Sequence, residues 1–308
     1  MNRQHIRGQS RPSGARQYAP RSQRESAGRR NAARVNLTRT RRSPAGVLAI
    51  ALIVAAALGN AASARASAAR ELLDESARRN GIATWRDRTL AATIESRSGD
   101  SVARTREAKI AESNDPDGGH RTFIEFTSPS DVEGMLYLHL KPHGGEEQEW
   151  LYAPQARRSR RLTPGQSDET SSGAELGYRE VESVTQLLSL REPDADASLV
   201  GDETLDGRVC RVVRYIPRSP QAGADGWDIW LGADDLLVYK LVPRAGGRAP
   251  KEILLSHYET IAGHATPRVV DVTGPDAAWR TVFKLRDVRY DVGLGDGTFS
   301  LSRLNAGH

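Results

Sequence analysis

Residues 121–140 read RTFIEFTSPSDVEGMLYLHL. Two apolar runs of strand length, RTFIEFT and GMLYLHL, lie on either side of a Ser-Pro-Ser-Asp segment. Short runs rich in apolar and aromatic side chains, bounded by Gly, Pro, Asp and Ser, are typical of β-strands joined by turns. This stretch therefore predicts two neighbouring strands, and the pattern repeats along the chain.

The same pattern of short apolar segments and turn residues continues in both directions from this stretch. Segments with partial period-two alternation, separated by clusters of turn residues, predict about eleven strands. The segments are TLAATIES, VARTREAKIAE, RTFIEFT, GMLYLHL, EQEWLYAP, RVCRVVRYIP, GWDIWLG, LLVYKLVP, KEILLSHYE, TPRVVDVT and TVFKLRDVRYDV. Because short turns connect most of them, we expect one antiparallel sheet that is strongly curved or partly closed.

Few helices accompany these strands. Residues 66–79 predict a helix with Leu72, Leu73 and Ala77 on one face, closed by Asn80-Gly81. Residues 184–190 predict a second, short helix. A sheet of this size must bury one face. We therefore expect one to three helices to lie on its concave side as a plug or lid, with an apolar cavity between helices and sheet.

The net charge of +5 over 308 residues hides an uneven distribution. Residues 1–43 contain twelve arginines and one acidic residue, whereas residues 65–308 contain 32 basic and 38 acidic residues. A basic chain would suggest a nucleic-acid partner. Because the part expected to fold is acidic, we expect no nucleic-acid partner.

The N-terminal region has the pattern of an export signal. After Arg41-Arg42, residues 45–58 form an uncharged apolar run of 14 residues, followed by a small-residue site at Ala62-Ser63-Ala64. This order is typical of a secretory signal peptide, and the run is shorter than the ~20 residues of a membrane span. We predict a disordered Arg-rich extension (1–43), a signal-peptide apolar region with its cleavage site (44–64), and one periplasmic β domain (65–308).

No motif predicts catalysis, a metal or a cofactor. Cys210, the only cysteine, lies in the apolar segment VCRVV with no identifiable histidine partner, so we expect a small buried hydrophobe. Residues 202–206 (DETLD), before Gly207, predict a turn rather than a calcium loop. We therefore expect a protein that is not an enzyme and binds no cofactor.

One histidine pair has the spacing of a metal site on a helix. His139 and His143 are four residues apart in HLKPH. The segment instead predicts a strand running into Pro142, which points the two rings in different directions. We expect ordinary histidines at a strand end and no metal.

Several segments together match one family pattern. FIEFTSPSDVEGMLYLHL, EWLYAPQARRSRRL and SSGAELGYREV follow the order hydrophobic strand, S-P-x-D-x-x-G, apolar strand, W-x-Y-x-P, Arg-rich strand and Gly-centred loop. The matching positions are Ser128, Pro129, Asp131, Gly134, Trp150, Tyr152, Pro154, Arg157 to Arg161, Gly173, Tyr178 and Glu180. Over nearly all of residues 66–304 the chain resembles the exported outer-membrane lipoprotein-sorting protein family, which is LolA/LolB-like.

The resemblance implies a fold and a class of function. The fold is an unclosed antiparallel half-barrel with helices as its lid, and the function is binding of lipid or lipoprotein acyl chains in the periplasm. We expect a ligand site at the apolar cavity and its rim, and its candidate residues are Trp150, Tyr152, Arg158, Arg160, Arg161, Gly173, Leu176 and Tyr178. The chain departs from the family pattern at residues 171–176 (SSGAEL), where family members carry bulkier apolar residues.

Four arginines in five positions, RRSRR at 157–161, follow a turn expected at Pro154-Gln155-Ala156. One interpretation is cross-strand pairing with Glu146, Glu147 and Glu149 on the solvent face, worth about 0.2–1 kcal/mol per pair. The other is an anion site at the rim of the cavity, because guanidinium groups bind phosphate and carboxylate.

Two hypotheses on function follow, with an enzyme as a distant third. The first is a monomeric periplasmic carrier or chaperone for a hydrophobic cargo. The second is a periplasmic accessory or sensor subunit that binds an inner-membrane transporter or envelope protein without lipid transfer. A continuous apolar concave surface favours the first, a cavity filled by the protein's own side chains favours the second, and a buried cluster of titratable groups favours an enzyme.

Overall fold

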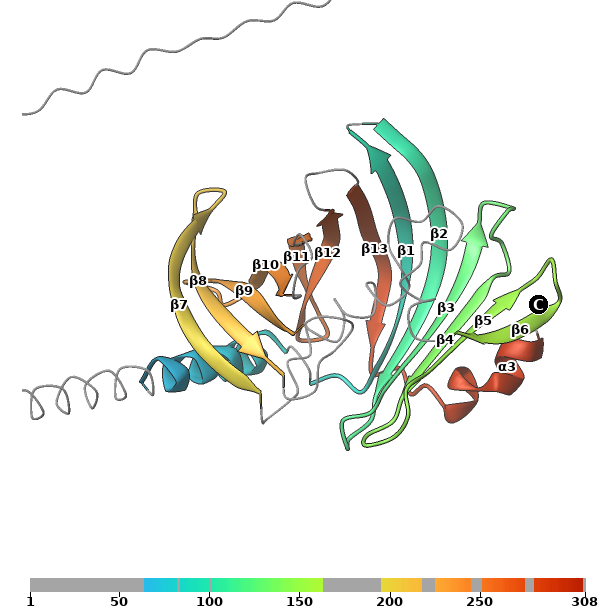
Figure 1. Ribbon diagram of the computed structural model, residues 1–308, viewed down its shortest axis with the longest axis horizontal. Helices are drawn as coiled ribbons and strands as arrows, with labels where there is room; N and C mark the ends of the chain where they lie inside the picture. The colour runs from blue at the N-terminus through green and yellow to red at the C-terminus, as the bar shows by residue number, and fades with distance from the viewer. Residues whose placement is uncertain are drawn as a thin grey trace, which may run out of the picture. The chain divides into compact units, whose positions relative to one another are not determined.

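The computed structural model describes residues 64–81, 84–99, 101–162, 195–217, 225–244, 251–274 and 280–306. All of these belong to one compact unit. They form a single sheet of thirteen strands with helices against both faces (Figure 1).

The helices and strands have the following bounds. A helix spans residues 64–80. The strands are β1 (Asp87–Ser98), β2 (Ser101–Asn114), β3 (His120–Ser128), β4 (Leu136–Lys141), β5 (Gln148–Ala153), β6 (Arg158–Leu162), β7 (Asp196–Leu205), β8 (Arg208–Ile216), β9 (Gly226–Gly232), β10 (Val238–Arg244), β11 (Glu252–Ile261), β12 (His264–Thr273) and β13 (Arg280–Tyr290). A 3₁₀ helix, η2 (Asp296–Phe299), and the helix α3 (Leu301–Ala306) follow the last strand.

The strand order explains how the chain builds this sheet. The order is β6-β5-β4-β3-β2-β1-β13-β12-β11-β10-β9-β8-β7, and the paired neighbours are antiparallel. The chain thus runs from the central strand β1 outward to the edge strand β6, continues at the opposite edge with β7, and returns strand by strand to β13 beside β1. The sheet is strongly curved and is not closed, so β6 and β7 are its two edges (Figure 1).

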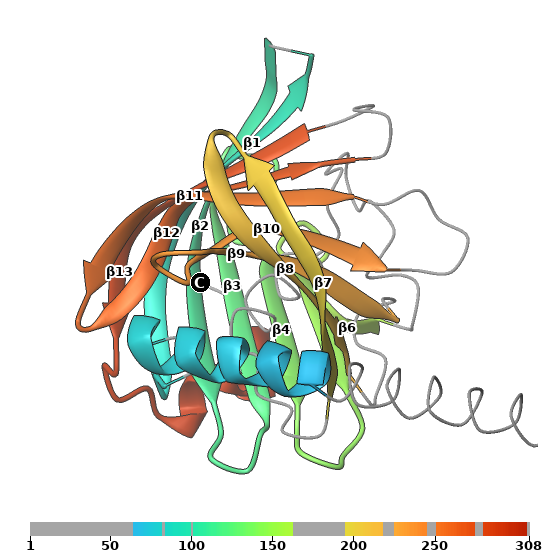
Figure 2. The ribbon, with the colours of Figure 1, turned by 90° about the vertical axis from the view of Figure 1, so that its left-hand side faces the viewer.

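Period-two alternation gives the sheet two different faces. One face carries the large core cluster, which includes Ile124, Tyr137 and Leu151 together with Ala69 and Leu73 of the helix 64–80. We call this the inner face. Figure 2 shows this helix in front of the strands.

The opposite, outer face carries two smaller clusters. Phe123, Leu136 and Leu138 pack against Phe299 of η2 and Leu304 of α3. Farther along the sheet, Cys210, Val212 and Trp230 form a separate buried cluster. Cys210 is fully buried, as the sequence predicts.

The predicted fold class is confirmed, with two differences in detail. The sheet has thirteen strands instead of about eleven. The main omission is β7, whose residues are mostly exposed. An edge strand has no sheet neighbour on one side and is often polar. The acidic sequence of β7 therefore resembles that of a turn. Only Asp206 and Gly207, both with positive φ, make the turn itself.

The second difference concerns the placement of one of the helices. The helix at 66–79 is confirmed and runs from 64 to 80, and it packs on the inner face. The helix α3 packs on the outer face instead of the concave side. The predicted helix at 184–190 and the predicted boundaries at 43 and 64 concern residues that lie largely outside the described part. Among the described residues, no helix combines the length and apolar character needed to cross a membrane.

Candidate functional site

The inner face is a continuous apolar surface across most of the sheet. Every strand from β1 to β6 and from β8 to β13 contributes to its core cluster; examples are Ile94, Ile110, Val213, Ile229 and Leu255. All of these side chains are buried. The inner face therefore has the chemistry of a hydrocarbon-binding surface, and the chain itself covers it.

The helix 64–80 is part of this cover and is held at its C-terminal end. The Ser76 hydroxyl donates to the carbonyl of Leu236 at 2.7 Å, and the Asn80 amide donates to the carbonyls of Asp235 and Leu236 at 3.1 and 3.0 Å. These contacts tie the helix to the turn between β9 and β10. The helix thus shields the inner-face residues against which Ala69 and Leu73 pack.

A row of buried polar side chains crosses one end of the inner face. Arg88 lies opposite Glu112, Glu112 opposite Thr122, Thr122 opposite His139, and His139 opposite Glu149. Each is at most 7% exposed, which is unusual for charged residues. We call these five residues the inner polar row.

The alternation of each strand places the row on the inner face. Its members lie two residues from the core residues Leu90, Ile110, Ile124, Tyr137 and Leu151. Residues two apart in a strand share a face. The polar row and the apolar surface are therefore parts of one face.

The first two members of the row form a buried ion pair. The Arg88 Nε donates to the Glu112 carboxylate, and the Arg88 guanidinium also lies 4.8 Å from the centre of the Trp85 ring. Burial lowers the pKa of Arg88, but the neighbouring Glu112 and Tyr290 more than offset this, so the pKa of Arg88 is raised. Glu112 is thus the ion-pair partner of the buried Arg88 guanidinium.

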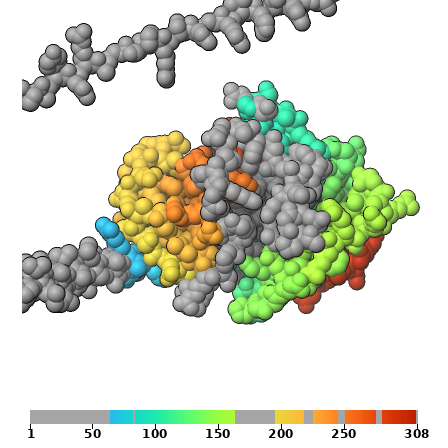
Figure 3. Space-filling view, in the orientation of Figure 1, coloured from blue at the N-terminus to red at the C-terminus, as the bar shows by residue number. Residues whose placement is uncertain are grey.

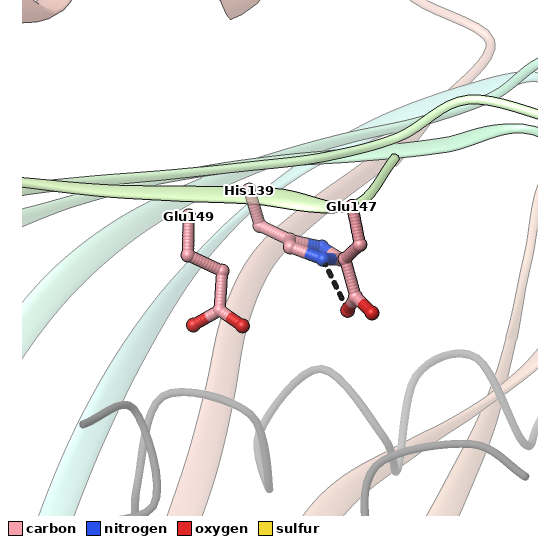
Figure 4. Close-up of side chains that lie close together, drawn as sticks. All are labelled: His139, Glu147 and Glu149. Atoms are coloured by element: carbon pink, nitrogen blue, oxygen red, sulfur yellow. Dashed lines mark hydrogen bonds and ion pairs between the residues drawn. The ribbon is translucent and has the colours of Figure 1, made fainter. Parts of the chain in front are cut away.

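The other end of the row gathers a histidine and two carboxylates. His139 Nε2 lies 2.8 Å from Glu147 Oε1, and the Tyr137 hydroxyl donates to Glu149 Oε2 at 3.2 Å. Figure 4 shows that His139, Glu147 and Glu149 project to the same side of the two strands. His139 and Glu149 are buried, whereas the Glu147 side chain is 41% exposed.

The arginine hairpin lies at the β6 edge of the sheet. A turn at residues 154–157 joins β5 to β6, as predicted. Arg158, Arg160 and Arg161 are exposed, and Arg161 pairs with Glu146 at 2.7 Å. Figure 3 shows this hairpin on the surface, beside the C-terminal helix. The cross-strand interpretation is thus confirmed for Arg161.

Two of the predicted ligand-binding residues, Trp150 and Tyr152, point to the outer face of the sheet. Trp150 and Tyr152 pack with the outer cluster of Leu138 and Leu304, whereas Leu151 between them joins the inner core. They lie on the outer face, not on the concave face where we expected them. A one-residue change of register moves a whole strand to the other face, and the sequence alone did not fix that register.

The other candidates from the sequence are three residues of the Gly-centred loop and the histidines of HLKPH. Gly173, Leu176 and Tyr178 lie outside the described residues. His139 is buried on the inner face and His143 is exposed, so the two histidines are not a pair.

Sequence reasoning did not find the inner polar row. Its members come from five strands, and each alone is an ordinary polar residue in a strand. The available signal was a charged or histidine side chain at the inner-facing positions of otherwise apolar strands. That signal can be used only after the inner face is known.

Comparison with known proteins gives one family match and a common fold. A family model described as "Uncharacterized protein" matches residues 118–306. No curated protein is significantly similar to the chain.

Three solved structures have similar folds. A DUF1329 family protein from Desulfovibrio piger is 24% identical, with a TM-score of 0.63 over 77% of this chain and 98% of that one. A putative outer membrane lipoprotein-sorting protein domain from Vibrio parahaemolyticus is 19% identical, with a TM-score of 0.64 over 78% and 99%. A LolA superfamily protein from Nitrosomonas europaea is 13% identical, with a TM-score of 0.56 over 76% and 98%. At these identities the similarity establishes the fold.

Proposed function

The chain belongs to the family whose model matches residues 118–306, and its fold is that of LolA superfamily and lipoprotein-sorting proteins. On these grounds we propose that it is an exported, non-enzymatic binding protein for a hydrophobic cargo. The cargo is an acyl chain of a lipid or lipoprotein. It binds on the inner face in the periplasm, after cleavage near Ala64. The observation that carries the proposal is the continuous apolar inner face of an open sheet.

Energetics make such binding reversible. Each buried methylene contributes about 0.8 kcal/mol, so a C16 chain gains much from the inner face. A membrane solvates the same chain equally well, so net affinity can be modest and transfer can run in both directions. The helix 64–80 must move to admit the chain, which reduces the apparent affinity by the fraction of molecules that are open.

The exposed arginines of the hairpin complete the proposal. Arg158 and Arg160 project from the β6 edge of an otherwise acidic domain. Guanidinium groups bind phosphate and carboxylate well. We propose that they contact the anionic head group or membrane surface from which the cargo is taken.

A second candidate follows from the burial of the inner face. Its apolar residues are covered by the protein's own chain. This favours an accessory or sensor subunit that binds an inner-membrane transporter or envelope protein and carries no lipid. In that role the folded domain binds the transporter or envelope protein without opening its core.

Two measurements separate these functions. Native mass spectrometry of the exported protein tests for co-purified lipid, and tryptophan fluorescence is titrated with a C16 fatty acid and a diacylated lipopeptide. The carrier proposal expects saturable binding of an acyl probe. If no acyl probe or detergent tail saturates the protein and no lipid co-purifies, the accessory role replaces it.

A pair of serine variants tests the movement of the helix. Ser76→Ala removes the hydrogen bond from the Ser76 hydroxyl to Leu236, whereas Ser67→Ala changes an exposed serine that bonds to Glu71 of the same helix. We expect Ser76→Ala to bind the probe several-fold more tightly or faster, and Ser67→Ala to behave as the wild type. Equal binding by all three proteins would contradict entry beneath the helix.

A further inference from the structure

We propose that His139, Glu147 and Glu149 form a binding site for a divalent cation of the Zn²⁺ class at the end of the inner polar row. The proposal is independent of the identity of the cargo. It starts from the arrangement of the three side chains. Their ligand atoms all lie within 4.8 Å of one another.

The register of two strands creates this arrangement. His139 on β4 lies directly opposite Glu149 on β5. Glu147 is two residues before Glu149 and therefore points to the same side. The three side chains project together in Figure 4. β4, β5 and the residue just before β5 thus bring one imidazole and two carboxylates close together.

The geometry is close to what a metal requires. Zinc binds nitrogen and carboxylate oxygen at about 2.0–2.2 Å in a tetrahedral arrangement, which separates ligand atoms by roughly 3.3–3.5 Å. His139 Nε2 and Glu147 Oε1 are now 2.8 Å apart. Glu147 precedes β5 and is partly exposed, so a small rotation of its side chain would admit an ion between the three ligand atoms.

The donor set indicates the class of ion. Imidazole favours Zn²⁺ and its first-row neighbours over Mg²⁺ and Ca²⁺. Three protein ligands leave a fourth position for water or another ligand. Metal binding requires both carboxyl groups to be deprotonated, and a bound divalent cation neutralises the charge of the two carboxylates.

The surroundings hold two of the ligands in place. His139 is fully buried and Glu149 is 4% exposed. The Tyr137 hydroxyl donates to Glu149 Oε2, and such a bond orients a ligating carboxylate. The site therefore has two fixed ligands and one adjustable ligand at its exposed side.

The experiment compares two neighbouring glutamates. Glu147→Gln removes a ligand from the exposed side of the site, so the fold should be kept. Glu146→Gln is the matched control, because Glu146 is exposed and pairs with Arg161 instead. The full-length exported protein, without a histidine tag, is titrated with Zn²⁺ by calorimetry, and its Co²⁺ form is examined by absorption spectroscopy.

We expect the wild type and Glu146→Gln to bind one Zn²⁺ per chain with equal affinity. Glu147→Gln should bind at least ten-fold more weakly, the size of effect seen even when supporting residues of metal sites are changed. The Co²⁺ spectrum should show nitrogen and oxygen ligands with low coordination number, and it should change in Glu147→Gln only. Absence of stoichiometric Zn²⁺ binding by the wild type, or unchanged binding by Glu147→Gln, would overturn the proposal. Acyl-probe binding measured in the same variants shows separately whether the carrier function holds.

Discussion

The two arms of the sheet bury very different side chains on the same inner face. In β8–β11, all of which are described, no polar or charged side chain is buried. In β1–β5 the inner polar row brings buried arginine, glutamate, threonine and histidine side chains together. Both arms belong to one antiparallel sheet, so the backbone structure does not explain why only one arm buries polar and charged side chains.

The two arms differ in what a stable core alone would explain. The β8–β11 arm buries apolar side chains beneath the helix 64–80, which is what a stable core needs. The β1–β5 arm accepts the desolvation of charged groups, which is costly unless they are paired. Local departures from the rules of a stable core are expected mainly at functional sites. The polar arm is therefore where we place the proposed cation site, whereas the apolar arm offers the surface for an acyl chain.

The largest expected effect comes from breaking the buried ion pair of the polar arm. Glu112→Gln leaves the Arg88 charge buried without its carboxylate, and we expect the free energy of unfolding to fall by about 3–5 kcal/mol. Urea denaturation measures this. As a control, Arg88→Met combined with Glu112→Leu should restore stability to near the wild-type value. A cost below about 1 kcal/mol for Glu112→Gln would mean that the pair is solvated.

The matching test in the apolar arm is Ile229→Ala. Ile229 is fully buried in the inner core, so the substitution removes buried methylene groups and leaves a cavity. We expect a loss of about 3 kcal/mol, and about 1 kcal/mol for the smaller change Ile229→Val, both from urea denaturation. If both variants were as stable as the wild type, this arm would not be the tightly packed one.

A smaller effect with a pH signature is expected on the outer face of the apolar arm. Burial raises the pKa of Asp228, but hydrogen bonds from Arg214 and Arg244 outweigh this, so the pKa is lowered. The ionised carboxylate of Asp228 therefore stabilises the folded protein at pH values above about 4, the pKa of an aspartate in the unfolded chain. This stabilisation is lost as the pH falls through the lower pKa that Asp228 has in the folded protein.

The variant Asp228→Asn checks this. We expect it to be about 1 kcal/mol less stable than the wild type near pH 7 and the difference to shrink below about pH 4. Urea denaturation across pH measures both. The control Asp234→Asn changes an exposed acid nearby and should have little effect. A difference that is constant with pH would exclude the ionised carboxylate as its cause.

The smallest effect is expected at the edge strand β6, which lies beside the polar arm. Arg158 and Arg160 are exposed, and exposed ion pairs contribute about 0–1 kcal/mol. Replacing both with Gln should leave the melting temperature within a few degrees, as followed by circular dichroism. Binding to anionic vesicles should weaken in the same variant. A large drop in melting temperature would instead show that these arginines support the fold.

The sequence by itself determined the local structure of most of the chain. The alternation in RTFIEFT and GMLYLHL marks strands wherever they lie, and the turn at 154–157 and the helix at 64–80 have local signals. These features depend on residues close together in sequence. The exception, β7, is polar because it is an edge strand, and its local pattern resembles a turn.

Only the tertiary structure decided which face is inner and what meets on it. Trp150 and Leu151 are neighbours in sequence, yet they belong to different cores, because the pairing register of β5 sends alternate side chains to opposite faces. In the same way, Arg88 and Glu149 belong to one row only because four strand pairings are in register. Register is set by long-range packing of the whole sheet, and no short segment contains it.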